Sequence, residues 1–88
     1  MKVLVIYRPN SEHGRIVEDF IHDYQARQHG GKIEVVNIDS REGMATANLY
    51  DIVEYPTILV LRDDGGIIRA WQGQILPLMN EVAAYAYA

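Results

Sequence analysis

The stretch Ile52–Leu61, with the sequence IVEYPTILVL, decides the fold of this chain. It joins the end of a helix-like segment to an apolar run that is rich in β-branched residues. Pro56 has no backbone N–H to donate, so it fits the first position of a strand better than the middle of one. The Tyr55–Pro56 bond is a candidate for a cis peptide, because X–Pro bonds adopt that form more readily than other peptide bonds. Residues 57–61 are therefore predicted to form a strand that is buried on both faces.

The first half of the chain predicts a strand, a helix and a second strand. Val3–Ile6 is a continuous apolar run, as in a strand covered on both faces, and Lys32–Ile38 is the next strand-like segment. The helix between them has Asn10 or Ser11 as its expected N-cap. Its apolar stripe is predicted to contain Ile16, Val17, Phe20, Ile21 and Tyr24. This order indicates a parallel unit with a right-handed crossover.

The second half predicts a helix, a hairpin and a last helix. The apolar side of the helix that begins at Asp39-Ser40 is expected to contain Met44, Ala47 or Ala45, Leu49, Tyr50 and Val53. Asp63–Gly66 is a hairpin-turn sequence, after which Ile67–Trp71 returns as an antiparallel edge strand. Strict alternation would place Ile67, Arg69 and Trp71 on one face of that strand. The C-terminal helix is expected to begin near Pro77 and to bury Leu78, Met79, Val82, Ala83 and Ala86.

These elements give the order βαβαββα in one domain over residues 1–88. The predicted fold class is α/β, with a four-stranded mixed sheet and three helices that cover both faces. A chain of 88 residues leaves no room for a second core.

Composition and charge exclude several classes of function. Hydrophobic residues make up 49% of the chain, yet no apolar run reaches the length of a membrane span, and we expect a cytoplasmic protein without a membrane partner. The net charge of −4 and the scattered basic residues disfavour nucleic acid as a partner. The sequence has no cysteine, so neither a disulfide nor a thiolate nucleophile can form.

Three local patterns resemble the thioredoxin superfamily, which includes the glutaredoxins. Residues 7–15, YRPNSEHGR, are similar to the family's aromatic-x-x-x-Cys-x-x-Cys-Lys/Arg segment. Tyr55-Pro56-Thr57 is similar to its cis-proline step, and Asp63–Gly66 with Gly73 resembles its hairpin and strand exit. The resemblance implies a peptide groove in which the cis-proline faces the start of the first helix. Only Gly73 matches the glycine-rich glutathione site of the glutaredoxin branch.

The resemblance does not extend to the redox centre. Ser11 stands where the family has its attacking cysteine and Gly14 where it has the resolving one. A serine hydroxyl stays protonated at a helix N-terminus, so thiol–disulfide exchange is excluded for this chain.

We therefore expect a redox-inactive binding module with a protein or peptide partner. The predicted groove residues are Arg8, Asn10, Ser11, His13, Arg15, Tyr55, Pro56 and Thr57. An alternative is a small-anion or glutathione-type binder at the helix N-terminus between Arg8 and Arg15. A third hypothesis is a monothiol oxidoreductase in which serine replaces the cysteine at position 11.

Neither a catalytic residue nor a metal or other cofactor is predicted. Ser11 and His13 are two positions apart, and residues at that spacing do not face each other on a helix. His22 and His29 are about 10.5 Å apart along a helix axis, too far to share an ion. Asp19, His22 and Asp23 fit a solvated polar face better than a metal site.

Overall fold

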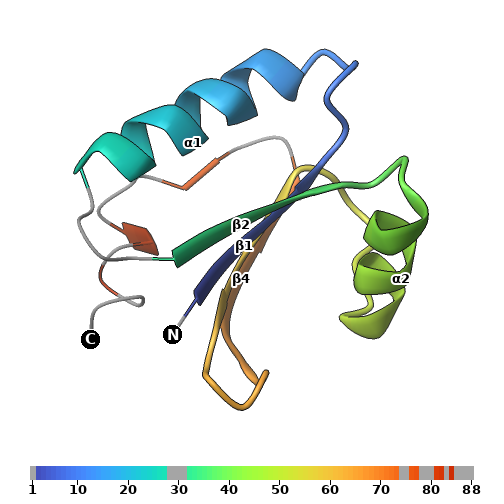
Figure 1. Cartoon of the computed structure of the whole chain (residues 1–88), viewed down its shortest axis with the longest axis vertical. Helices are drawn as coiled ribbons and strands as arrows, with labels where there is room; N and C mark the ends of the chain where they lie inside the picture. The colour runs from blue at the N-terminus through green and yellow to red at the C-terminus, as the bar shows by residue number, and fades with distance from the viewer. Residues whose placement is uncertain (1, 28–31, 74–75, 78–80, 83, 85–88) are drawn as a thin grey trace.

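The computed structural model describes residues 2–27, 32–73, 76–77, 81–82 and 84. Within these residues one α/β unit contains a four-stranded mixed sheet and two helices (Figure 1). The elements are β1 (Lys2–Tyr7), α1 (Gly14–Arg27), β2 (Lys32–Asn37), α2 (Arg41–Leu49), β3 (Thr57–Leu61) and β4 (Ile67–Gln72).

The strand order in the sheet is β2-β1-β3-β4. β1 pairs in parallel with β2 and antiparallel with β3, and β3 pairs antiparallel with β4. The two apolar runs that predicted fully buried strands form these central strands. Val3–Ile6 is at most 3% exposed, and every residue of β3 is buried.

The two faces of the sheet have separate cores. Alternate residues of β1 explain the division, because successive side chains of a strand point to opposite faces. On one face Val3, Val5 and Tyr7 pack with Val17, Ile21 and Tyr24 of α1. On the other face the buried cluster contains Leu4, Ile6, Ile38, Ala47, Ile52, Leu59 and Leu61.

Both predicted helix stripes need correction. Ile16, placed on the buried side of α1, is 60% exposed, because the inward face of the helix is centred on Val17, Ile21 and Tyr24. In α2 the large apolar residues lie outside the core: Met44 is exposed by 57% and Leu49 by 74%. Val53, which follows the helix, is 81% exposed, and the exposed Ala45 likewise lies outside the core.

Two small residues form the buried face of α2 instead. Gly43 and Ala47 are the buried residues of this helix, one turn apart. A Cβ atom at Gly43 would lie 1.9 Å from the carbonyl oxygen of Asn37, so glycine allows the helix to approach the end of β2. The larger apolar side chains, Met44 and Leu49, take no part in this contact and are exposed.

The hairpin between β3 and β4 has the predicted turn but a different register. Arg62 N–H donates to Gly66 O at 2.8 Å, and Gly65 has a φ of +91°, which favours glycine. A register shift at Val60/Leu61 interrupts the alternation of β4. Arg69 and Trp71 share a face, with the guanidinium carbon 5.1 Å from the indole centroid, but Ile67 belongs to the other face.

The third predicted helix falls largely outside the described residues. This applies to Leu78, Met79, Ala83 and Ala86 of its predicted apolar face. Val82 is described and is fully buried in the cluster beneath α1. The C-terminal segment therefore contributes at least one side chain to the core.

Candidate functional site

The loop after β1 is held by two side chains that bond the backbone of Arg8. The Ser11 hydroxyl donates to the Arg8 carbonyl oxygen at 2.5 Å. The Arg8 N–H donates to His13 Nε2 at 3.2 Å, which requires that this nitrogen carry no proton. The His13 ring also lies near Tyr7, with 6.5 Å between the ring centroids. The bonds from Ser11 and to His13 hold the Arg8 backbone in place, and they thereby position its side chain.

This geometry corrects the predicted N-cap of α1. The helix begins at Gly14, and the first helical hydrogen bond runs from Val17 N–H to His13 O at 3.0 Å. Asn10 and Ser11 therefore precede the cap position, and the Ser11 hydroxyl is used inside the loop. A Cβ atom at Gly14 would lie 2.1 Å from the carbonyl oxygen of Pro9, so the loop folds back tightly on the helix start.

An ion pair connects this loop to the loop after β2. Arg8 Nε donates to Asp39 Oδ1 at 3.0 Å, and both side chains are about half exposed. Asp39 is positioned in turn by its own N–H, which donates to Asn37 Oδ1 at 2.8 Å. Because β1 and β2 are parallel, their carboxyl ends meet at the same edge of the sheet, and the loops that follow them become neighbours.

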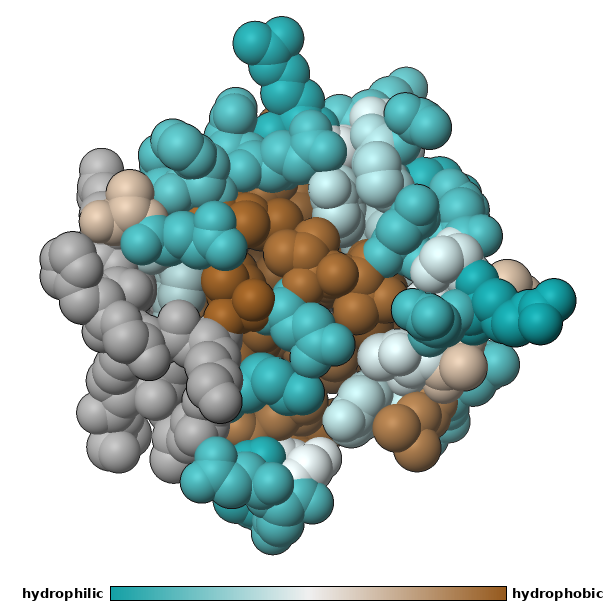
Figure 2. All heavy atoms as spheres, in the orientation of Figure 1, coloured by the Kyte–Doolittle hydropathy of each residue, from teal (hydrophilic) through white to brown (hydrophobic). Residues whose placement is uncertain are grey.

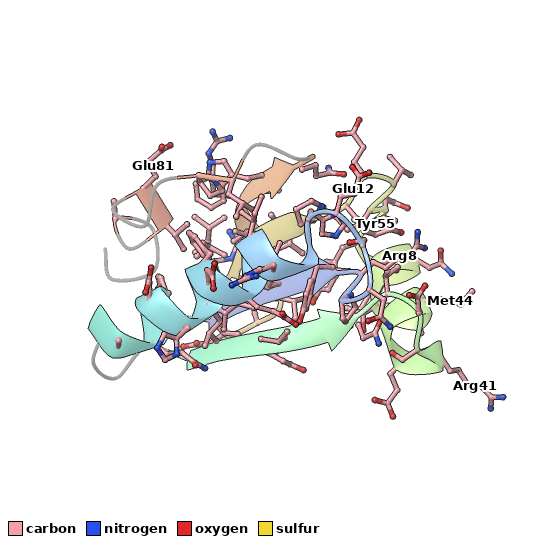
Figure 3. All side chains as sticks on the ribbon, turned by 90° about the horizontal axis from the view of Figure 1, so that it is seen from above. Arg8, Glu12, Arg41, Met44, Tyr55 and Glu81 are labelled. Atoms are coloured by element: carbon pink, nitrogen blue, oxygen red, sulfur yellow. The ribbon has the colours of Figure 1, made fainter. Side chains whose placement is uncertain are left out.

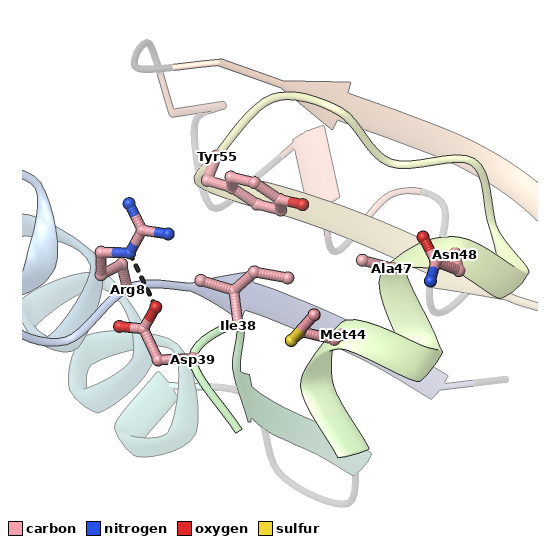
Figure 4. A pocket seen from close by; sticks show the side chains of 7 residues that line it. All are labelled: Arg8, Ile38, Asp39, Met44, Ala47, Asn48 and Tyr55. Carbon is pink, nitrogen blue, oxygen red and sulfur yellow. Dashed lines mark hydrogen bonds and ion pairs between the residues drawn. The ribbon is translucent and has the colours of Figure 1, made fainter. Parts of the chain in front are cut away.

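A pocket of about 320 Å³ opens beside this ion pair. Its lining residues are Arg8, Ile38, Asp39, Met44, Ala47, Asn48 and Tyr55. Figure 4 shows the Tyr55 ring across from Ile38, with the α2 side chains on one side and the ion pair on the other. Buried Ile38 and Ala47 provide an apolar floor, whereas Asn48 and the ion pair supply polar groups at the rim. We call this hollow the Arg8–Tyr55 pocket.

Tyr55 reaches the pocket from the segment that precedes β3. The Tyr55–Pro56 peptide bond is cis in the structure. The Tyr55 hydroxyl donates to Ile52 O at 3.4 Å, which directs the half-buried ring toward α2. Figure 3 shows Arg8, Tyr55 and Met44 gathered at one end of the molecule.

Pro56 and Thr57 support the segment from within the fold. Both side chains are fully buried, and the Thr57 hydroxyl donates to Glu54 O at 2.5 Å. The Pro56 carbonyl oxygen accepts from Gly73 N–H at 3.0 Å, and this bond ties the segment to the end of β4. Of these three neighbouring residues, Tyr55 is therefore the one that lines the pocket.

The structure brings together only part of the predicted groove. Arg8 and Tyr55 line one pocket, whereas Asn10, Ser11 and His13 belong to the loop beside it and Arg15 lies exposed in the first turn of α1. Sequence reasoning missed five of the lining residues: Ile38, Asp39, Met44, Ala47 and Asn48. For Ile38 and Asp39 the available signal was topological, because residues that directly follow β2 must lie beside the loop that follows β1.

The described residues were also compared with the requirements of a metal site and of a membrane-spanning helix. No group of three His, Asp or Glu side chains among them has an arrangement that could hold a metal ion. Neither α1 nor α2, over the positions that the structure describes, is long and apolar enough to cross a membrane.

Comparison of the chain with protein-family models and with curated proteins returns no match. The chemistry of the Arg8–Tyr55 pocket is therefore inferred from its own residues.

Proposed function

We propose that this protein is a thioredoxin-like domain without redox chemistry that binds a peptide or protein segment. In this proposal the full fold has the order βαβαββα, with a third helix after Pro77 that covers the α1 face. Ser11 and Gly14 occupy the positions of the family's two cysteines, and the groove that serves thiol exchange in the family serves binding here.

The observation that supports this proposal best is the joining of Arg8 and Tyr55 in one pocket. An apolar floor with a few polar groups at the rim is the usual composition of a site that accepts an apolar side chain and orients it by hydrogen bonds. Met44 is 57% exposed at the wall of the pocket, and methionine adapts its shape to different partners. An apolar side chain of a bound segment would contact Met44 and the Tyr55 ring.

The rim favours an uncharged or amphipathic segment over a free anion. The Arg8 guanidinium already donates to Asp39, so an anion must compete with a carboxylate for it. A peptide needs no such exchange, because its backbone can bond the Asn48 amide while the ion pair stays closed. Anion or glutathione binding near residues 10–15 remains the alternative proposal.

The test is a selection of phage-displayed heptapeptides on the whole chain, followed by an amide NMR titration with the selected peptides. We expect amide shifts at Ile38, Met44 and Tyr55. Met44→Asp should abolish binding, because it places a charge on the apolar wall. Leu49→Asp is the matched control, since Leu49 is exposed on the same helix but does not line the pocket.

Titrations with phosphate and glutathione at two salt concentrations test the alternative. Shifts confined to residues 10–15 that disappear at high salt would support anion binding instead. Peptides that bind Met44→Asp as well as they bind the original chain would contradict the proposed use of this pocket.

A further inference from the structure

A second hollow, of about 360 Å³, lies on the opposite face of the sheet, between α1 and β2. Its lining residues are Tyr7, Glu18, Ile21, His22, Gln25 and Val35. Figure 2 shows an apolar surface across the middle of this side of the molecule, below α1 and over β2. Val35 lines the hollow and is 43% exposed.

The strand beside this hollow has an open edge. β2 is the first strand in the order β2-β1-β3-β4, and β1 is its one neighbour in the described sheet. All six residues of β2 pair in regular register with β1. The strand has neither a proline nor a bulge, two of the devices that commonly block strand addition at an edge.

The hydrogen-bond pattern shows which groups face outward from this edge. Ile38 N–H donates to Tyr7 O at 2.9 Å. In a parallel pair alternate residues bond the neighbouring strand, so Val36 and Glu34 also face β1. The backbone N–H and C=O groups of Ile33 and Val35 therefore point away from the sheet. The side chain of Val35 points toward α1 and into the hollow.

The lining of the hollow suits a long side chain that ends in a positive charge. Ile21 and Val35 provide apolar contact for an aliphatic stem. The Glu18 carboxylate accepts from the Tyr7 hydroxyl at 2.9 Å through one oxygen, and its other oxygen can accept from a second donor. Lysine and arginine combine an apolar stem with a cationic end in this way.

We propose that the β2 edge adds an extended basic segment of a partner protein as a fifth strand. The backbone of that segment pairs with Ile33 and Val35, and one lysine or arginine side chain enters the hollow to reach Glu18. The charge of the chain fits such a partner: the net charge is −4, and Asp19 and Asp23 are exposed on the same helix. This surface shares no residue with the Arg8–Tyr55 pocket, so the two proposals can fail separately.

The probe is a blocked heptapeptide, acetyl-Thr-Val-Thr-Lys-Thr-Val-Thr-amide, titrated into the isotope-labelled whole chain. We expect amide shifts at residues 33–36 and 18–25. Replacing the central lysine by glutamate should weaken binding about tenfold, and replacing it by norleucine about threefold. Methylation of the peptide's backbone nitrogens should abolish binding, since it removes the donors that pair with the strand edge.

Variants of the chain separate the cation contact from general attraction. Glu18→Gln should remove the preference for lysine over norleucine while the amide oxygen keeps a hydrogen bond from Tyr7. Asp19→Asn is the matched control, because it removes the same charge from the same helix outside the hollow. That variant should retain the preference.

Three results would overturn the proposal. The first is equal binding of the lysine, norleucine and glutamate peptides, and the second is a set of shifts confined to Ile38, Met44 and Tyr55. The third is a dimer, seen by sedimentation, that forms through β2 and excludes the lysine peptide. That result would assign the edge to a second copy of the chain.

Discussion

Gly43 lies so close to Asn37 that an added Cβ atom would stand 1.9 Å from the Asn37 carbonyl oxygen. The same carbonyl accepts from the Ser40 backbone N–H at 3.0 Å and from the Ser40 hydroxyl at 2.7 Å. The start of α2 is thereby held against the end of β2. This contact brings Ile38 and Asp39, which follow β2, together with residues of α2 in the lining of the Arg8–Tyr55 pocket.

The substitution Gly43→Ala should lower the free energy of unfolding by about 1–3 kcal/mol, the usual cost of overpacking. The obstructing atom is backbone, so the helix itself must move. Gly66→Ala is a matched control, because the atoms its Cβ would meet belong to the exposed, flexible Arg62 side chain. Urea unfolding of both variants makes the comparison. Equal stability of the two would show that α2 can shift without loss.

Ser40→Ala should destabilise the fold more than Ser11→Ala. The Ser40 hydroxyl oxygen accepts from Gly43 N–H at 2.9 Å as the N-cap of α2, and loss of such a cap costs about 1 kcal/mol. The Ser11 hydroxyl caps no helix and bonds only within its loop. Urea unfolding of the two single variants measures the difference. A larger loss for Ser11→Ala would place the start of α1 earlier than Gly14.

Stability should fall at alkaline pH in a way that depends on Tyr7. Burial, together with the Glu18 carboxylate, raises the pKa of the Tyr7 hydroxyl above its ordinary value. The folded state then holds this proton more tightly than the unfolded chain, whose tyrosines titrate at about pH 10. The stability that Tyr7 contributes is complete below that pH and is lost as the pH rises through the folded pKa.

Unfolding of Tyr7→Phe on both sides of about pH 10 tests this dependence, because phenylalanine has no proton to lose. The alkaline loss should be smaller in the variant. Lys2 acts in the same direction, since its hydrogen bond to Glu34 raises the pKa of the ammonium group. Unfolding of Lys2→Gln over the same pH range therefore measures how much Lys2 contributes to the alkaline loss of stability. An unchanged alkaline loss in Tyr7→Phe would contradict the assignment to Tyr7.

Asp39→Asn should increase the affinity of the loop for phosphate. The substitution frees the Arg8 guanidinium from its carboxylate partner, and it removes a negative charge from the rim. The cost in stability should stay below about 1 kcal/mol, because the pair is half exposed. Phosphate titration followed by amide NMR measures the effect, with Arg8→Gln as the variant that should not respond. Equal phosphate binding by Asp39→Asn and the original chain would exclude Arg8 as an anion ligand.

The strands were predictable because their signal is local. Continuous apolar runs such as Val3–Ile6 require burial on both faces, and the structure confirms it. The turn at Asp63–Gly66 follows from glycine, which accepts the positive φ seen at Gly65. The register shift at Val60/Leu61 had no such signal, because it depends on how two strands fit together.

The face of α2 and the composition of the pocket were not predictable from hydrophobicity alone. Large apolar residues such as Met44 and Leu49 suggested the buried side, yet Gly43 and Ala47 form it. Contact between backbones selects small residues, and a scale of hydrophobicity does not register that preference. Asp39 was missed for a different reason: its partner Arg8 is distant in sequence, and only the parallel pairing of β1 and β2 makes the two neighbours.

β1 lies between β2 and β3 in the sheet, so the order in which the strands are made differs from their order in the sheet. β1 pairs with residues 32–37 on one side and residues 57–61 on the other, yet it is translated before both. Among the described strands, β1 is therefore made before either of its neighbours, and its second neighbour follows only with residues 57–61. Until β3 has been made, Leu4 and Ile6 lack the partner strand that covers one edge of β1, and a chaperone that binds apolar nascent segments would find its target there.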